Sequence, residues 1–126
     1  MIICLVIQPI FDQYKNLEKN TGIENIQEAI SLVKSVGKIK LENNFALKVR
    51  KVFPGTFFSK DSLNFIFESL NKNSANLVFI NSNISAIQQR NIERYLKVKV
   101  IDRTGLILEI FSERAKSFEG RLQVDL

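Results

Sequence analysis

LVFINSNISAIQQRNIERYLKVKVIDRTGLILEIF, residues 77–111, is the stretch that decides the fold. Two short apolar runs stand out in it, Leu77–Ile80 and Val98–Ile101, and each has the length of a buried strand. A segment of helical periodicity follows each run. This strand–helix–strand–helix order is typical of parallel sheets whose faces are covered by helices.

The two helices of this stretch have distinct sequence signals. Ser85 is followed three residues later by Gln88, a capping box that predicts a helix ending near Leu96. The second helix is predicted to begin near Thr104 and to run through an apolar series at helical spacing, Leu106, Ile107, Ile110 and Phe111.

The same alternation continues toward the N-terminus. Ile2–Gln8 is a continuous apolar run that predicts a buried strand, and Pro9 is expected to end it. The polar stretch from Phe11 to Gly22 indicates a loop with one helical turn. A helix is then predicted from about Ile23 to Val36, with Gly37 as its C-terminal cap and an apolar face formed by Ile26, Ala29, Ile30 and Val33.

A second strand is predicted within Lys38–Val52, where apolar and polar side chains alternate. After Pro54 and Gly55, either Ser59 or Asp61 is expected to cap a helix that continues to about Leu70. The apolar face of that helix is Leu63, Ile66, Phe67 and Leu70. Together these elements predict the α/β class: a small Rossmann-like layer sandwich with a four-stranded, mainly parallel sheet flanked by helices.

Composition excludes several kinds of chemistry. The chain has 126 residues and no histidine, which excludes Ser-His-Asp and Cys-His catalysis. Its single cysteine, Cys4, lies inside the first apolar run and is expected to be a buried thiol in a reducing cytosol. Neither GxxxxGK[ST] nor GxGxxG occurs, so no nucleotide site of either kind is predicted. No membrane span and no signal peptide are predicted, which favours the cytoplasm.

Two groups of residues are candidates for function. Asp102 follows the last predicted strand, at the edge where open α/β sheets bind ligands, and Thr104 lies beside it. Both residues are also suited to capping the next helix. The net charge is +5, and the third helix and its exit supply a group of cations for RNA contact: Arg90, Arg94, Lys97, Lys99 and Arg103. An ordinary solvated helix surface is the alternative interpretation of that group.

Residues 83–93, NISAIQQRNIE, resemble a Gln-x-Arg-Asn-Leu-Glu pattern of the HflX family. The segments KVIDRT at 99–104, LILEIF at 106–111, ERA at 113–115 and EGRLQV at 119–124 follow in the order and spacing of that family. The resemblance covers about residues 77–126, and the layout of residues 1–76 fits the same domain more loosely. It departs at residues 59–62, Ser-Lys-Asp-Ser, where the family usually has a Gly-x-Gly-Lys step.

The resemblance implies a GTPase that associates with the large ribosomal subunit and its RNA and separates stalled ribosomes. Residues 1–117 would be its N-terminal α/β subdomain, and residues 118–126 would begin a long helical hairpin that precedes the P-loop domain. GTP and Mg²⁺ would bind in that domain, so this chain alone is expected to be no enzyme, to hold no cofactor and to bind no DNA.

Without the hairpin, Leu122, Val124 and Leu126 would lack a partner, which predicts a frayed or self-associating C-terminal end. The other hypothesis is a free-standing α/β module that binds a small ligand near Asp102.

Overall fold

A computed structural model describes the backbone of residues 2–11 and 21–125, and the side chains as far as residue 115 except those of residues 21–25. The four strands are β1 (Ile2–Phe11), β2 (Ile39–Val49), β3 (Leu77–Ile80) and β4 (Lys99–Asp102). The four helices are α1 (Thr21–Lys34), α2 (Lys60–Asn73), α3 (Ala86–Leu96) and α4 (Arg103–Asp125). The loop predicted between β1 and α1 lies mostly outside the described residues.

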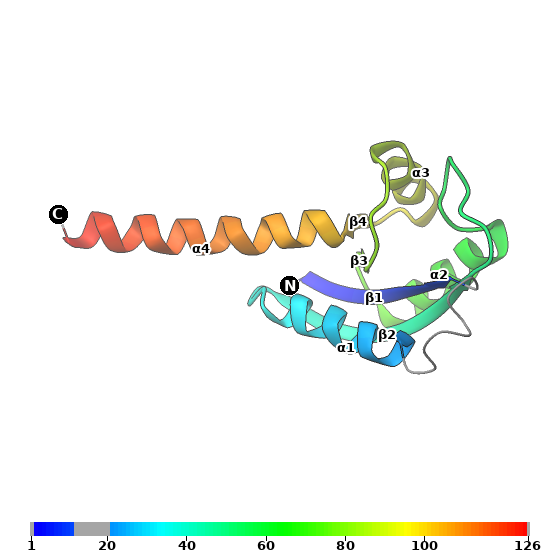
Figure 1. Ribbon diagram of the computed structural model, residues 1–126, viewed down its shortest axis with the longest axis horizontal. Helices are drawn as coiled ribbons and strands as arrows, with labels where there is room; N and C mark the ends of the chain where they lie inside the picture. The colour runs from blue at the N-terminus through cyan, green and yellow to red at the C-terminus, as the bar shows by residue number, and fades with distance from the viewer. Residues whose placement is uncertain (1, 12–20, 126) are drawn as a thin grey trace.

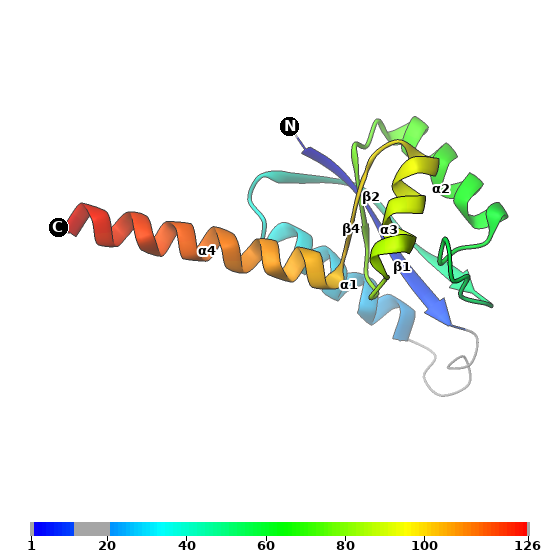
Figure 2. The same cartoon turned by 90° about the horizontal axis from the view of Figure 1, so that it is seen from above.

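The strands form one parallel sheet in the order β2-β1-β3-β4 (Figures 1 and 2). Helices α2 and α3 pack on one face, where Ile66 and Ile92 belong to the larger hydrophobic core. Helices α1 and α4 pack on the other face, where Val33 and Leu106 belong to a second core. The predicted α/β layer sandwich with a four-stranded parallel sheet is therefore confirmed.

The prediction that Pro9 ends the first strand is wrong, because β1 continues to Phe11. Its partner β2 pairs with it along the whole length, from Ile2 to Phe11. On the side of β1 that faces β3, the last backbone hydrogen bond is donated by Asn81 N–H to the Ile7 carbonyl. Backbone groups two residues apart in a strand point to the same side, so the position of Pro9 faces the side where β3 has already ended. The N–H that proline lacks is not needed there.

Strand β2 changes its buried face halfway along. The register against β1 shifts by one residue between Leu41 and Asn43, which makes Glu42 the extra residue of a β-bulge. Before the bulge, Leu41 packs against the α1/α4 core; after it, Phe45 and Leu47 pack against the α2/α3 core. Because side chains alternate between faces, one inserted residue moves the odd-numbered positions from one face to the other.

The helix ends match the sequence signals in α2 and α3 but not in α1. Ser59, rather than Asp61, caps α2, and its hydroxyl accepts a hydrogen bond from Ser62 N–H. The capping box of Ser85 and Gln88 is present at α3 as predicted. Gly37 was expected to cap α1, but α1 ends at Lys34, and Gly37 does not adopt the positive φ of such a cap.

Helix α4 begins against the sheet and extends well beyond it (Figure 1). Leu106 and Ile110 are buried against the sheet, whereas Phe111, also expected on the apolar face, is 61% exposed. The helix continues without interruption to Asp125, so fraying is not observed as far as that residue. Self-association of the C-terminal end stays a prediction.

The Cys4 thiol is fully buried in the second core, as predicted. Burial raises its pKa from 9.0 to about 12, against a smaller opposing effect of a backbone hydrogen bond at Phe79. The thiol therefore stays protonated in the folded chain at a pH where the unfolded chain ionises it. This contribution to stability is complete below pH 9 and is lost as the pH rises toward 12.

We expect Cys4 to make the free energy of unfolding fall by about 1 kcal/mol between roughly pH 8 and 10, because only the unfolded state releases the proton. Denaturant titrations of the wild type and of Cys4→Ala across this range measure the effect, since the other titrating groups are common to both. Equal slopes in the two proteins would contradict the burial of the thiol.

Candidate functional site

At the carboxyl end of β4, the Asp102 carboxylate accepts two backbone hydrogen bonds. Oδ1 accepts from Gly105 N–H at 2.8 Å, which makes Asp102 the N-cap of α4. Oδ2 accepts from Ile84 N–H at 3.3 Å, in the loop before α3. Both oxygens therefore hold the fold together. An added Cβ on Gly105 would lie 2.9 Å from the Ile101 side chain, so the close approach of this turn to β4 requires glycine.

The neighbours of Asp102 are also engaged locally. The Thr104 hydroxyl donates to Asn83 Oδ1 at 2.9 Å. The guanidinium of Arg103 lies 2.6 Å from a carboxylate oxygen of Glu28 on α1, in an ion pair that is about half-exposed. Arg103 thus connects α4 to α1 on the face of the sheet opposite α3.

The five cations predicted for RNA contact do not form one patch. Arg90 and Arg94 are exposed on α3, one helical turn apart. Lys97 is the C-terminal cap of α3 in a left-handed conformation, and Lys99 begins β4 at the amino edge of the sheet. Arg90, Arg94 and Lys97 therefore lie together along α3. Arg103 lies at the carboxyl edge of the sheet, where it pairs with α1 on the opposite face.

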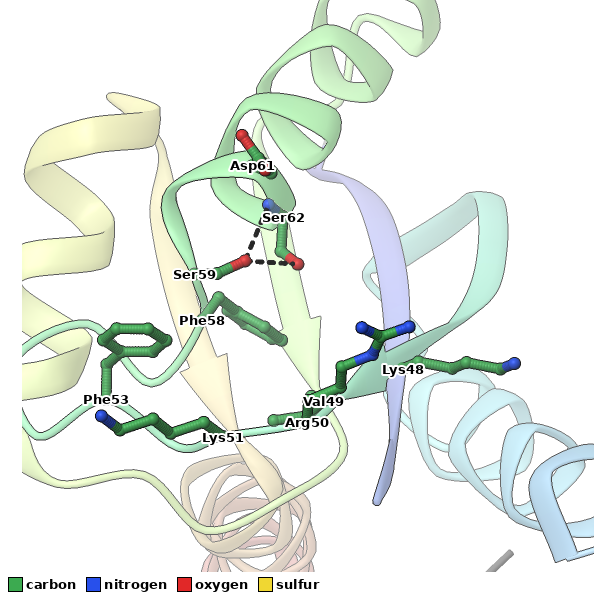
Figure 3. A pocket seen from close by; sticks show the side chains of 9 residues that line it. All are labelled: Lys48, Val49, Arg50, Lys51, Phe53, Phe58, Ser59, Asp61 and Ser62. Carbon is green, nitrogen blue, oxygen red and sulfur yellow. Dashed lines mark hydrogen bonds between the residues drawn. The ribbon is translucent and has the colours of Figure 1, made fainter. Parts of the chain in front are cut away.

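A cavity of about 380 Å³ lies where β2 ends and α2 begins (Figure 3). Of the residues that the structure describes, the charged ones that line it are Lys48, Arg50, Lys51 and Asp61. The remaining lining residues are Val49, Phe53, Phe58, Ser59 and Ser62. This cavity was not predicted from the sequence, although the run Lys48-Val49-Arg50-Lys51 lies at the end of a predicted strand.

The segment after β2 is held in one conformation by α3. Phe53 and Phe57 form an isolated antiparallel bridge, and their backbones are joined by hydrogen bonds of 3.1 and 2.8 Å. From α3, Gln88 Nε2 donates to the Phe53 carbonyl at 2.9 Å and Asn91 Nδ2 donates to the Gly55 carbonyl at 2.8 Å. Phe57 has a φ of 64°, an unfavourable value for a bulky residue that is maintained by its buried ring.

Gln88→Ala is expected to lower the free energy of unfolding by about 2 kcal/mol, because it removes the capping-box acceptor for Ser85 N–H and the donor to the Phe53 carbonyl. Gln88→Glu keeps the acceptor and loses the donor, so it isolates the contact with Phe53. Denaturant titration measures both variants. A Gln88→Glu protein as stable as the wild type would show that this contact contributes nothing.

A second cavity, of about 340 Å³, lies at the amino edge of the sheet beside α4. Apolar side chains dominate its lining, among them Ile2, Ile39 and Leu106. Across the described part of the chain, no three His, Cys, Asp or Glu side chains are placed to hold a metal ion. None of the described helices is long and apolar enough to cross a membrane.

Comparison with known proteins places this architecture in a family. A family model described as "GTP-binding GTPase N-terminal" matches residues 23–112. The chain is 38% identical over 108 residues to GTPase HflX of Escherichia coli K12, covering 86% of this chain and 25% of that protein. It is 35% identical over 101 residues to GTPase HflX of Magnetococcus marinus, covering 80% of this chain and 23% of that protein. It therefore spans about a quarter of the length of these relatives.

Solved structures show the same fold. The crystal structure of SsGBP with GDP has a TM-score of 0.63 at 24% identity, over 99% of this chain and 33% of that chain. A GTP-binding protein from Sulfolobus solfataricus in complex with GDP has a TM-score of 0.58 at 22% identity, over 89% of this chain and 30% of that chain. The match of the family model and the identity to the HflX proteins show that this chain belongs to the GTP-binding GTPase N-terminal family, as the N-terminal domain of an HflX-type GTPase.

Proposed function

We propose that this chain is the docking and regulatory module of an HflX-like GTPase that associates with the large ribosomal subunit and takes part in splitting and rescuing ribosomes. The observation that carries the proposal is the match of residues 23–112 to the family model, together with the identity to HflX GTPases over most of the chain. Since neither nucleotide-binding motif occurs in the sequence, the module itself is non-catalytic.

The division of labour follows from the same proposal. Residues 1–117 form the α/β subdomain, and residues 118–126 begin the helical hairpin that connects it to the GTPase domain, where GTP and Mg²⁺ bind. The protein acts in the cytoplasm, where its ribosomal partner is.

The proposed contacts with ribosomal RNA use the cations of α3 and its exit, Arg90, Arg94, Lys97 and Lys99, with Arg103 in a lesser role. Arg90 and Arg94 are exposed and share a helix face, an arrangement that suits neighbouring phosphates. Arg103 has to leave Glu28 to reach a phosphate, which lowers its contribution.

The alternative function is a small-ligand site near Asp102. Its strongest argument is the position at the carboxyl end of β4. Both carboxylate oxygens of Asp102 already accept backbone hydrogen bonds, so a ligand there would have to compete with the cap of α4. Ribosome docking is therefore the function that we favour.

Co-sedimentation of the purified chain with isolated large and small ribosomal subunits tests the proposal. We expect binding to the large subunit at low salt and much weaker binding to the small subunit. Equal recovery with both subunits would indicate only non-specific attraction of a basic protein to RNA. No recovery with either subunit would contradict a docking role for this domain.

A further inference from the structure

We propose that two copies of this chain pair edge to edge through β2, so that their two four-stranded sheets join into one continuous sheet. The run that pairs is residues 43–49 of each copy, which we call the β2 edge. The two runs lie antiparallel, related by a two-fold axis at Ala46. This pairing does not depend on the proposed ribosomal function.

β2 is an outer strand, and among the residues that the structure describes no strand lies beside it on the side away from β1. The Ile7 carbonyl accepts a hydrogen bond from the β3 side, so the even-numbered residues of β1 bond to β2. Gln8 has Ala46 as its partner, and in a parallel ladder it bonds to the residues on either side of that partner. The residues whose backbone groups point away from β1 are therefore Asn44, Ala46 and Lys48.

Most of these outward groups are available to a further strand. The Asn44 N–H donates to Asn43 Oδ1 at 2.8 Å, a local bond that a neighbouring strand can replace. For the N–H and C=O groups of Ala46 and Lys48, the described residues supply no partner, and both side chains are exposed. Backbone groups arranged in this way are a template for strand addition.

The opposite edge of the sheet, at β4, is closed by side chains of α3. The Val100 N–H donates to Glu93 Oε2 at 3.0 Å, and the Val100 carbonyl accepts from Gln89 Nε2 at 2.7 Å. Gln89 and Glu93 thus take the place of a further strand at that edge. Two copies joined through β2 would have this closed edge at both ends, so the assembly stops at a dimer.

The length of the β2 edge determines the register of the pairing. The bulge at Glu42 bends the strand, and Val49 is its last residue. The regular run between them is centred on Ala46. Antiparallel pairing about this residue lets Ala46 bond to Ala46 of the second copy, and Asn44 to Lys48. The whole run then pairs with its outward groups aligned.

The side chains of the β2 edge also complement one another. On the α2 face, Phe45 lies opposite Leu47 of the second copy, and both are half-buried. Phe65 of α2 is 50% exposed and packs edge to face on Phe45, with ring centroids 5.1 Å apart. The second copy covers this apolar strip with its own. On the α1 face, Lys48 lies opposite Asn44 of the second copy, so no like charges are directly opposed.

The size of the interface determines the expected affinity. One short strand pair and the α2 rings beside it bury less than the roughly 1,200 Å² of a standard interface. Since β2 is already held along its length by β1, pairing orders little backbone, which favours association. We therefore expect a weak dimer, with a Kd on the order of 10–100 µM.

Sedimentation velocity of the purified chain, from about 5 to 500 µM, tests the pairing. We expect the sedimentation coefficient to rise from that of a monomer to that of a dimer and no further. Ala46→Pro removes only an N–H that points away from β1, so it should weaken dimerisation at least about tenfold and leave the sheet intact. Ala46→Ser keeps the N–H and should dimerise like the wild type. A chain that stays monomeric throughout, or equal dimerisation of the two variants, would overturn the proposal.

A second pair of variants leaves the backbone unchanged. Ala46→Lys opposes two ammonium groups at the two-fold axis, whereas Ser112→Lys adds the same charge at an exposed position of α4. We expect only Ala46→Lys to weaken dimerisation. Phe111→Ala removes an exposed ring of α4 and should have no effect. A dimer that Phe111→Ala dissociates and Ala46→Lys leaves intact would place the contact on α4 and overturn pairing through β2.

Amide hydrogen exchange at low and high protein concentration identifies the paired residues. We expect the amides of Phe45 and Leu47 to be protected at both concentrations, because they bond to β1. Those of Ala46 and Lys48 should become protected only when the dimer forms. Protection of Ala46 and Lys48 in the dilute monomer would show that another segment of the chain covers the β2 edge, and it would overturn the proposal. Exchange at these two amides that stays fast in the dimer would do the same.

Discussion

Phe79→Ala is expected to lower the free energy of unfolding by about 4 kcal/mol. The ring of Phe79 is fully buried in the second core, and β3 lies between β1 and β4, where Phe79 pairs with Val6 and Ile101. No neighbouring strand can move inward without breaking its hydrogen bonds to β3, so the removal of the ring leaves a cavity. Equilibrium denaturation in urea measures the loss.

Phe111→Ala is the matched control, because it removes the same ring from a site that is 61% exposed. We expect it to change the free energy of unfolding by less than about 1 kcal/mol. A loss of less than about 1.5 kcal/mol in Phe79→Ala would contradict the position of β3 inside the sheet.

Asp102→Ala is expected to cost about 3 kcal/mol, the second-largest effect. The substitution removes the N-cap of α4 and the acceptor for Ile84 N–H, which is left without its partner. Because the carboxylate joins α4 to the loop before α3, its loss loosens two helices at once. Thermal and chemical denaturation both report on it.

Asp102→Asn separates the two hydrogen bonds. Its side-chain oxygen can still cap α4 but cannot accept both N–H groups, so we expect a loss of about 1 kcal/mol. If Asp102→Ala were as stable as the wild type, the carboxylate would have no structural role. A ligand site near Asp102 would then become the better interpretation.

The elements with complete local signals could be predicted from the sequence. Residues 77–80 form β3 with the predicted bounds, because a short, fully apolar run is typical of a strand that is buried on both faces of the sheet. Ser85 and Gln88 fixed the start of α3, because both partners of the capping box are specified within four residues. Ser59 and Asp61 offered equivalent caps for α2, so only the structure distinguishes them.

Features that depend on distant partners could not be predicted. Pro9 fits inside β1 only because β3 ends before it on the side that Pro9 faces. The sequence around Pro9 does not show where β3 ends. The bulge at Glu42 depends on the register between β1 and β2. Gly37 had the right place for a cap, yet α1 ends three residues before it.

The candidate sites show the same division. Arg90 and Arg94 share a helix face because they are four residues apart, so the sequence alone predicts that they lie together. Their separation from Arg103 could not be predicted without the topology, which puts α3 and α4 on opposite faces of the sheet. The cavity at the end of β2 depends on α3 as well, since Gln88 and Asn91 hold a segment more than thirty residues earlier in the chain.

The salt dependence of binding to large ribosomal subunits tests the central claim most directly. We expect the logarithm of the binding constant to fall linearly with the logarithm of the salt concentration. We also expect Arg90→Ala/Arg94→Ala to lower the affinity and the steepness of this dependence relative to Lys34→Ala/Lys72→Ala, a control that removes the same charge from exposed positions at the ends of α1 and α2. Binding that does not depend on salt, or an Arg90→Ala/Arg94→Ala variant that behaves like the Lys34→Ala/Lys72→Ala control, would contradict docking through the cations of this domain.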